Sequence, residues 1–174
     1  MYSFNSYYKK ILLIFFFLIV FASCNNAQRE YESNLSHFKH VIEAINMYFM
    51  DPTLEKLEIS NYYTEDFIFH SYPAGYKKGI ATFKGDYIES FNQMKNMRMS
   101  MQIGHSIYLP GIDENTYKIN GSVRVYYGAI LSIDTNHIEF SGYQTINFDE
   151  GKISEIWEWS DYGGVKSHLN EFLK

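Results

Sequence analysis

The sequence predicts an α+β fold in which a curved antiparallel β-sheet, shaped as a cone or half-barrel, packs against N-terminal helices. Apolar residues recur at helical spacing in the first part of the chain, and from residue 98 the period changes to two and stays there. Gly121, Gly128 and Gly142 fall in or beside the long strands, where glycine allows a strand to bend. A bent sheet closed by helices would enclose a pocket.

The first residues have the pattern of a signal peptide. Lys9 and Lys10 precede an apolar run over 11–22. As a helix this run would be about 18 Å long, well short of the roughly 30 Å core of a bilayer. A basic start, a short apolar middle and small residues before a cleavage point predict a signal peptide over 1–23 in preference to a membrane span.

The lone cysteine follows directly. "FASC", which ends at Cys24, resembles the lipobox of bacterial lipoproteins, although Phe21 stands where that pattern prefers leucine. The resemblance implies that Cys24 is lipidated and that the protein is anchored by this lipid to a membrane of the cell envelope, on the periplasmic or outer-membrane face. An ordinary secretory signal is the alternative. A lipidated Cys24 would leave no thiol for disulfides, catalysis or metal binding.

Composition excludes several further classes of function. Removing residues 1–23 takes away two lysines and no acids, so 15 − 2 = 13 basic residues face 20 acidic ones, a formal charge of −7. Without a basic patch, nucleic acid is not an expected partner. No histidine pair has metal-ligand spacing and no glycine-rich phosphate loop follows a strand, so we expect no metal and no cofactor. We expect a lipidated tether over 24–34 and one domain over 35–174.

The helical part begins after the polar tether. Ser36 can cap a helix whose inner stripe is Phe38, Val41, Ile42, Ile45, Tyr48 and Phe49. Asp51 and Pro52 stop this helix and can start a second, short one. A strand is then expected over 62–72, with Phe67 and Phe69 facing the core, and a third helix over 83–94.

Four strands follow, and period two assigns their faces. The apolar faces are Met99, Met101, Ile103, His105, Ile107 and Leu109 on the first; Tyr117, Ile119, Gly121, Val123, Val125, Tyr127, Ala129, Leu131 and Ile133 on the second; and Ile138, Phe140, Gly142, Gln144, Ile146 and Phe148 on the third. A tight turn over 149–151 leads to the last strand. There, period two places Glu155 and Asp161 on one face with Ile153, Trp157 and Trp159.

The element order, the strand "YYTEDFIFH" and the closing "FDEGKISEIWEWSD" resemble the nuclear transport factor 2-like superfamily, in particular its SnoaL-like polyketide-cyclase branch. That branch typically ends in a turn, strand, aromatic residue and aspartate, which are matched here by Gly151, Lys152, Ile153, Trp157 and Asp161. The resemblance implies a cystatin-like roll around a largely apolar cavity, with the aspartate able to act as a general base. Many SnoaL-like sequences have histidine where this chain has Gln144, which argues against an Asp-His proton relay.

Asp161 and His105 are the candidate catalytic residues. A carboxylate beside two tryptophans in a partly dry cavity can remove a proton next to a carbonyl. Alternatively, Asp161 orders the turn that follows the strand. His105, flanked by Ile103 and Ile107, could line the cavity as a proton donor, or be a buried structural histidine.

The candidate ligand-binding residues are Gln144, Trp157, Trp159, Tyr127, Tyr76 and His70. Gln144 lies in an otherwise apolar row and therefore needs a polar partner from the protein, water or a ligand. Tyr76, in the loop after the first strand, could close over the cavity mouth. His70 is expected at the rim or on the surface, because Phe67 and Phe69 take the opposite side of its strand.

Two hypotheses of function follow. In the first, a membrane-anchored domain binds a small apolar molecule or a partner without catalysis. In the second, the domain is a cyclase, isomerase or dehydratase with Asp161 as base and His105, Gln144 or a tyrosine steadying an oxyanion. The outer sheet face around Arg124 and Tyr126 is a candidate homodimer surface; a strict monomer in light scattering at high concentration would reject it.

Overall fold

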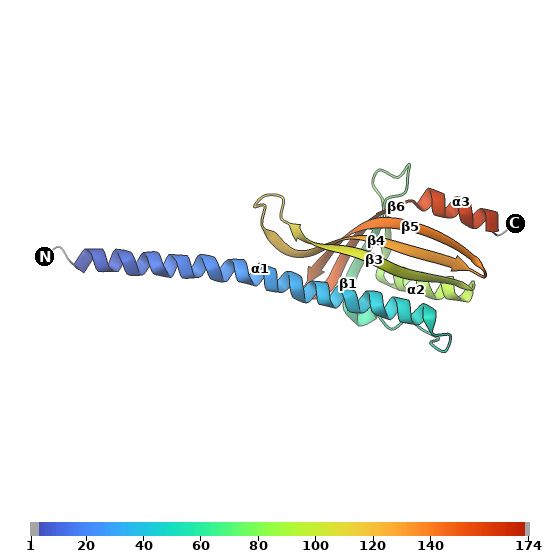
Figure 1. Cartoon of the computed structure of the whole chain (residues 1–174), viewed down its shortest axis with the longest axis horizontal. Coiled ribbons are helices and arrows are strands. Elements are labelled where there is room, and N and C mark those ends of the chain that lie inside the picture. Colours follow the sequence, from blue (N-terminus) through green and yellow to red (C-terminus); the bar gives the residue numbers. More distant parts are fainter. Residues whose placement is uncertain (1–3, 173–174) are drawn as a thin grey trace.

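The computed structural model describes the backbone of residues 4–172 and the side chains of residues 26–172. Its elements are α1 (Phe4–Met50), a 3₁₀ turn η1 (Ser60–Tyr62), β1 (Tyr63–Ser71), β2 (Ile80–Phe83), α2 (Lys84–Asn96), β3 (Met99–Ile112), β4 (Ile119–Ile133), β5 (Asn136–Asp149), β6 (Lys152–Ser160) and α3 (Tyr162–Phe172). Figure 1 shows α1 and α2 on one side of a curved sheet. Helix α3 follows β6 and is the last element of the chain. The predicted α+β class and the curved sheet are confirmed.

The sheet has six strands in the order β2-β1-β6-β5-β4-β3. All neighbouring pairs are antiparallel except β1 and β6, which run parallel. The sheet is therefore mixed, where a purely antiparallel one was expected. The short strand β2 was expected to be loop, and α3 was expected to be a turn.

Helix α1 extends further toward the N-terminus than expected. It was predicted to start near Ser36, but the predicted tether over 24–34 is helical, and Tyr31 and Asn34 are buried against the domain. The Asn34 side-chain amide donates to the Gly121 carbonyl at 3.0 Å. The predicted signal peptide and Cys24 lie outside the described side chains. No helix of the described residues has both the length and the apolar character needed to span a membrane.

The predicted inner stripe of α1 is confirmed by burial. Phe38, Val41, Ile45 and Tyr48 are each 1–2% exposed. The helix ends at Met50, directly before Asp51-Pro52, as proline requires. The second helix expected there is replaced by turns that lead into η1, in which Leu57 and Ile59 are buried and Leu54 is exposed.

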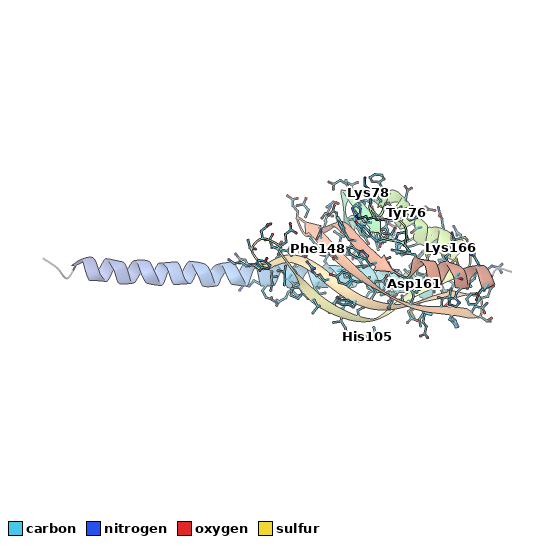
Figure 2. All side chains as sticks on the ribbon, turned by 90° about the horizontal axis from the view of Figure 1, so that it is seen from above. Tyr76, Lys78, His105, Phe148, Asp161 and Lys166 are labelled. Atoms are coloured by element: carbon cyan, nitrogen blue, oxygen red, sulfur yellow. The ribbon has the colours of Figure 1, made fainter. Side chains whose placement is uncertain are left out.

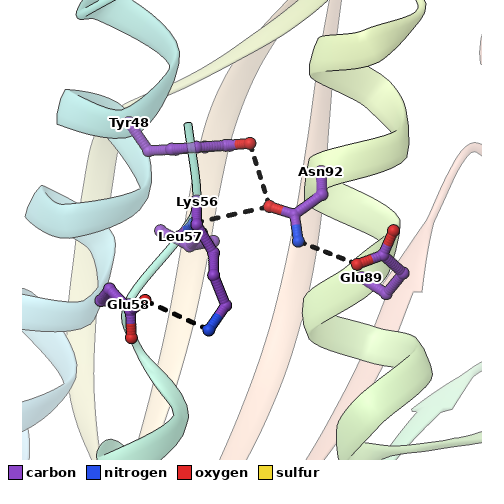
Figure 3. Close-up of polar contacts among 6 residues, drawn as sticks. All are labelled: Tyr48, Lys56, Leu57, Glu58, Glu89 and Asn92. Atoms are coloured by element: carbon purple, nitrogen blue, oxygen red, sulfur yellow. Dashed lines mark hydrogen bonds and ion pairs between the residues drawn. The ribbon is translucent and has the colours of Figure 1, made fainter. Parts of the chain in front are cut away.

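Asn92 joins α2 to α1 and to this irregular segment, as Figure 3 shows. Its side-chain carbonyl accepts from the Tyr48 hydroxyl at 2.9 Å and from the Leu57 backbone N–H at 3.5 Å, and its amide donates to Glu89 at 2.9 Å. This contact fixes the two helices that cover the inner face of the sheet.

Two β-bulges change which side chains face that space. In β3, Ile103 pairs with Ala129 but Ser106 pairs with Tyr127, so β3 has one residue more than β4 over this interval. In β6, Ile153 pairs with Phe148 but Glu155 pairs with Asn147, so Ser154 is the additional residue. Each bulge reverses the faces of all residues that follow it, because side chains alternate along a strand.

Candidate functional site

A cavity of about 400 Å³ lies between the inner sheet face and the three helices. This is a size that suits a drug-sized molecule. Most of its lining is aromatic or aliphatic. The rings come from Phe38, Tyr63, Phe69, Tyr87, Phe91, Tyr108, Tyr127, Phe140 and Tyr162, and the aliphatic surface includes Val41, Ile45, Met101, Ile103, Val125 and Leu131.

One carboxylate, that of Glu158 on β6, lines this apolar cavity. Its Oε2 atom accepts from the Tyr127 hydroxyl at 2.8 Å and from the Gln144 amide, and its Oε1 atom accepts from the Tyr162 hydroxyl. A half-buried charge is tolerated when hydrogen bonds satisfy it. The three donors therefore explain how an ionised Glu158 can be held among aromatic rings.

The three donors come from three different elements. Tyr127 is on β4 and Gln144 on β5, where Gln144 is directly opposite Glu158 in the strand register. Tyr162 is the first residue of α3. We call Glu158, Tyr127, Gln144 and Tyr162 the Glu158 cluster. It ties α3 to the sheet at the point where α3 forms one wall of the cavity.

Burial and the charge of Glu158 both raise the pKa of Tyr127 and of Tyr162 well above the usual value for tyrosine. Burial likewise raises the pKa of Tyr63 and of Tyr87, with the Glu158 charge adding to the effect at Tyr87. Tyr127 and Tyr162 are therefore neutral phenols, and each donates a hydrogen bond to Glu158. The cavity thus combines one acceptor carboxylate with two phenol donors, and the Lys166 side chain of α3 also lines it.

No family model matches the sequence, and no curated protein matches it significantly. The fold, however, is similar to several solved structures. BvnE pinacolase from Penicillium brevicompactum superposes with a TM-score of 0.59 at 13% identity, covering 80% of this chain and 93% of the other. A candidate polyketide cyclase from Xanthomonas campestris pv. campestris gives 0.54 at 13% identity, covering 74% and 90%.

A nuclear transport factor 2-like protein from Anabaena variabilis gives a TM-score of 0.52 at 15% identity, covering 74% of this chain and 89% of the other. The match covers most of both chains. The chain has the nuclear transport factor 2-like fold. This confirms the fold that the resemblance of the closing strand implied.

In this nuclear transport factor 2-like domain, two predicted ligand-binding residues lie at the cavity. Gln144 faces inward and finds its polar partner in Glu158, and Tyr127 contacts the same carboxylate. The unbroken alternation of β4 placed Tyr127 correctly, because Val123, Val125, Ala129 and Leu131 are buried on the same side.

Four other predicted ligand-binding residues do not line the cavity. Trp157 and Trp159 follow the β6 bulge and therefore face outward, where they stack with Tyr72 at ring-centroid distances of 5.9 and 4.8 Å. His70 lies on the same outer face, 4.7 Å from the Trp157 ring. Tyr76 is 58% exposed in the loop after β1, where Figure 2 shows it beside Lys78, and it is not among the residues that line the cavity.

The two predicted catalytic residues also lie outside the cavity. His105 was expected on the inner side of its strand, but the β3 bulge turns it to the outer face, where it is exposed and Figure 2 shows it on the convex side. Asp161 is exposed at the start of α3, where its carboxylate accepts from the Gly164 backbone N–H at 2.8 Å. Asp161 thus orders the segment that follows the strand, which was the alternative considered for it, but that segment is a helix and not a turn.

Glu158 and Tyr162 are the site residues that sequence reasoning missed. A signal for Glu158 was available, since Ile153 and Ile156 are both strong core residues yet differ by an odd number of positions. They can face the same core only if a bulge separates them, and Glu158 then faces inward with Ile156. Tyr162 precedes Gly163 and Gly164. Because glycine disfavours a helix, the sequence did not predict α3.

The outer sheet face carries a continuous aromatic row. Tyr126 on β4, Tyr143 on β5, Trp159 on β6 and Tyr72 directly after β1 lie side by side, with successive ring centroids 4.8, 5.8 and 4.8 Å apart. Tyr126 is 52% exposed. A homodimer through this face stays a prediction. Within residues 26–172, no group of three or more His, Cys, Asp or Glu side chains is arranged to hold a metal ion.

Proposed function

We propose that this domain is an enzyme of the cyclase or isomerase kind that moves a proton on a small, largely apolar carbonyl compound, with Glu158 as the general base. The observation that carries the proposal is the Glu158 carboxylate, the one carboxylate that lines a mostly aromatic and aliphatic cavity. Glu158 takes the role that the sequence assigned to Asp161. The names of the structural neighbours, a pinacolase and a candidate polyketide cyclase, support an enzyme more than a passive binding domain.

The proposed chemistry needs a base and donors at one place. Glu158 removes a proton from the carbon next to the substrate carbonyl and becomes a carboxylic acid, while the electron pair moves onto the carbonyl oxygen as an enolate. Tyr127 or Tyr162 can stabilise that oxygen if its single O–H turns from Glu158, which is neutral once it has taken the proton, to the enolate oxygen. Their raised pKa keeps both phenols protonated, so neither needs a prior proton transfer before it donates.

Non-catalytic ligand binding is the second candidate, and one observation favours it. Glu158 already accepts three hydrogen bonds from Tyr127, Gln144 and Tyr162. A carboxylate satisfied in this way is also suited to anchoring a ligand hydroxyl or amide. In that case the ligand would exchange places with one donor, and no proton would leave carbon.

Proton exchange distinguishes the two candidates. We would incubate the full chain with 2-tetralone, a small bicyclic ketone, in D₂O and follow loss of its α-proton signals by NMR, with tetralin as the binding control without a carbonyl. Exchange faster than in buffer supports catalysis. Binding of 2-tetralone with exchange at the buffer rate contradicts catalysis and supports the second candidate.

We further propose that the domain acts at a membrane surface, through the lipid expected on Cys24. Tyr31, only seven positions later, already packs on the domain, so the cavity would be held close to the bilayer that concentrates apolar compounds. Cys24→Ser should release the protein from membrane fractions. Retention of the variant at the level of the unaltered chain would contradict the anchor.

A further inference from the structure

The Tyr127 hydroxyl reaches Glu158 across an intervening strand. Tyr127 is on β4 and Glu158 on β6, and β5 lies between them. Strands two places apart are separated by about 9.5 Å, yet the hydroxyl and the carboxylate are 2.8 Å apart. The Tyr127 side chain must therefore lie down over the inner surface of β5 instead of standing upright from the sheet.

Gly142 is the residue of β5 over which that ring lies. It is directly opposite Tyr127 in the strand register, and its position in the alternation faces the cavity, between Phe140 and Gln144. A Cβ atom at 142 would be 2.5 Å from Tyr127 Oη, 2.6 Å from Cζ and 2.8 Å from Cε1. Cβ atoms in real structures essentially never approach non-bonded atoms this closely, so any side chain at 142 would displace the Tyr127 ring.

Backbone geometry gives no other reason for glycine at this position. Gly142 does not have the positive φ of Gly121 or Gly151, so its backbone is open to other residues. A glycine inside a strand usually weakens it, which fits a role in the close approach of another group. Here the approaching group is the Tyr127 phenol.

We propose that Gly142 is a positioning residue for the candidate site, whose missing side chain allows Tyr127 to reach Glu158. The contact itself can be tested whatever the reaction is, whereas its effect on catalysis rests on the proposed function. Gly128 provides a matched control. It is next to Tyr127 in sequence and within a strand, but a Cβ there would meet only the His105 carbonyl oxygen, at an ordinary 3.9 Å.

The experiment compares Gly142→Ala and Gly128→Ala in the full chain labelled at tyrosine ¹³Cζ, with the Tyr127 signal identified by its loss in Tyr127→Phe. In the unaltered chain and in Gly128→Ala, we expect the Tyr127 signal to remain that of the neutral phenol above about pH 10, where free tyrosine ionises. In Gly142→Ala the signal should shift at neutral pH and titrate at lower pH. A Tyr127 signal that is the same in both alanine variants would overturn the proposal.

Exchange of 2-tetralone gives the second readout. Displacing a group by about 1 Å can cost about 100-fold in rate, so Gly142→Ala should lose about as much as Tyr127→Phe, and the double variant should lose no more. If the chain shows no catalysed exchange at all, the proposed function fails while the NMR comparison still decides the role of Gly142. An unshifted Tyr127 signal with normal exchange overturns the role of Gly142 alone.

A third comparison applies if Gly142→Ala does not fold. Replacing Tyr127 by leucine removes the ring atoms that a Cβ at 142 would meet. The double variant Gly142→Ala with Tyr127→Leu should then unfold at the same urea concentration as Tyr127→Leu alone. A double variant that stays unfolded while Tyr127→Leu folds would show that glycine is needed for another reason, and would contradict the proposal.

Discussion

The inner and outer faces of β6 carry two glutamates, Glu158 and Glu155, in very different surroundings. Glu158 faces the cavity and accepts from two tyrosines and a glutamine. Glu155 faces outward, with a side chain 37% exposed, and accepts from Asn147 at 3.1 Å and from Trp157 at 3.3 Å, with His70 3.8 Å away.

The two residues have the same side chain, belong to the same strand and lie three positions apart. What separates them is the face of the sheet they occupy, since the cavity between the sheet and the helices is on the inner face. The comparison shows that the face of the sheet a side chain occupies, more than its identity, determines whether it reaches the cavity.

The largest expected difference between the faces is in stability. Ile156 is 1% exposed on the inner face, whereas Ile107 is 52% exposed on the outer face. Ile156→Ala should lower the free energy of unfolding by about 3 kcal/mol, because it leaves a void in the core. Ile107→Ala should change it by no more than about 0.5 kcal/mol. Urea unfolding measures both, and equal losses would mean that the assigned faces are wrong.

A smaller difference is expected for a tyrosine on each face. Tyr162→Phe removes a donor from the half-buried Glu158 carboxylate and should cost about 2 kcal/mol, as expected for a hydrogen bond to a charged group. Tyr143→Phe removes a hydroxyl whose contacts with Arg124 and Thr145 are both 3.5 Å long. Its cost in the same unfolding experiment should be within about 0.5 kcal/mol. Equal losses in Tyr143→Phe and Tyr162→Phe would contradict the claim that the hydrogen bonds of the Glu158 cluster stabilise the fold more than those of the outer face.

The smallest expected effect is in alkaline solution. Burial raises the pKa of Tyr127 in the folded chain, while in the unfolded chain it ionises near its usual value. The unfolded state therefore loses its proton first, and the stability that is complete below about pH 10 falls as pH rises, by up to about 1.4 kcal/mol per pH unit for this group. Tyr127→Phe should show a shallower fall. A slope unchanged by this substitution would mean that Tyr127 ionises equally in both states.

The sequence predicted those parts of the fold in which alternation or helical spacing runs without interruption. The 15-residue strand β4 contains no bulge against β5, so period two assigned Val123, Val125 and Tyr127 to the inner face correctly. The end of α1 before Asp51-Pro52 was equally clear, because proline cannot continue a helix.

The residues whose faces were predicted wrongly follow β-bulges, where the alternation of side chains along the strand is interrupted. On β3, apolar residues occupy both faces after the bulge, so the pattern around His105 contained no sign that its face was reversed. On β6 the sign was present in the odd spacing of Ile153 and Ile156. Asp161 was correctly recognised as able to cap a following segment, but that segment is a helix. Gly164 allows the cap, since a Cβ there would lie 2.2 Å from the Asp161 carboxylate.

The most direct test of the central claim is the rate of 2-tetralone α-proton exchange in Glu158→Gln and Glu155→Gln measured side by side. Both substitutions remove one negative charge from the same strand and preserve side-chain size. We expect Glu158→Gln to lose about 1,000-fold, as is typical when a general base is removed, and Glu155→Gln to exchange at the rate of the unaltered chain. Equal rates in the two variants, or a loss confined to Glu155→Gln, would contradict the assignment of the chemistry to the inner face.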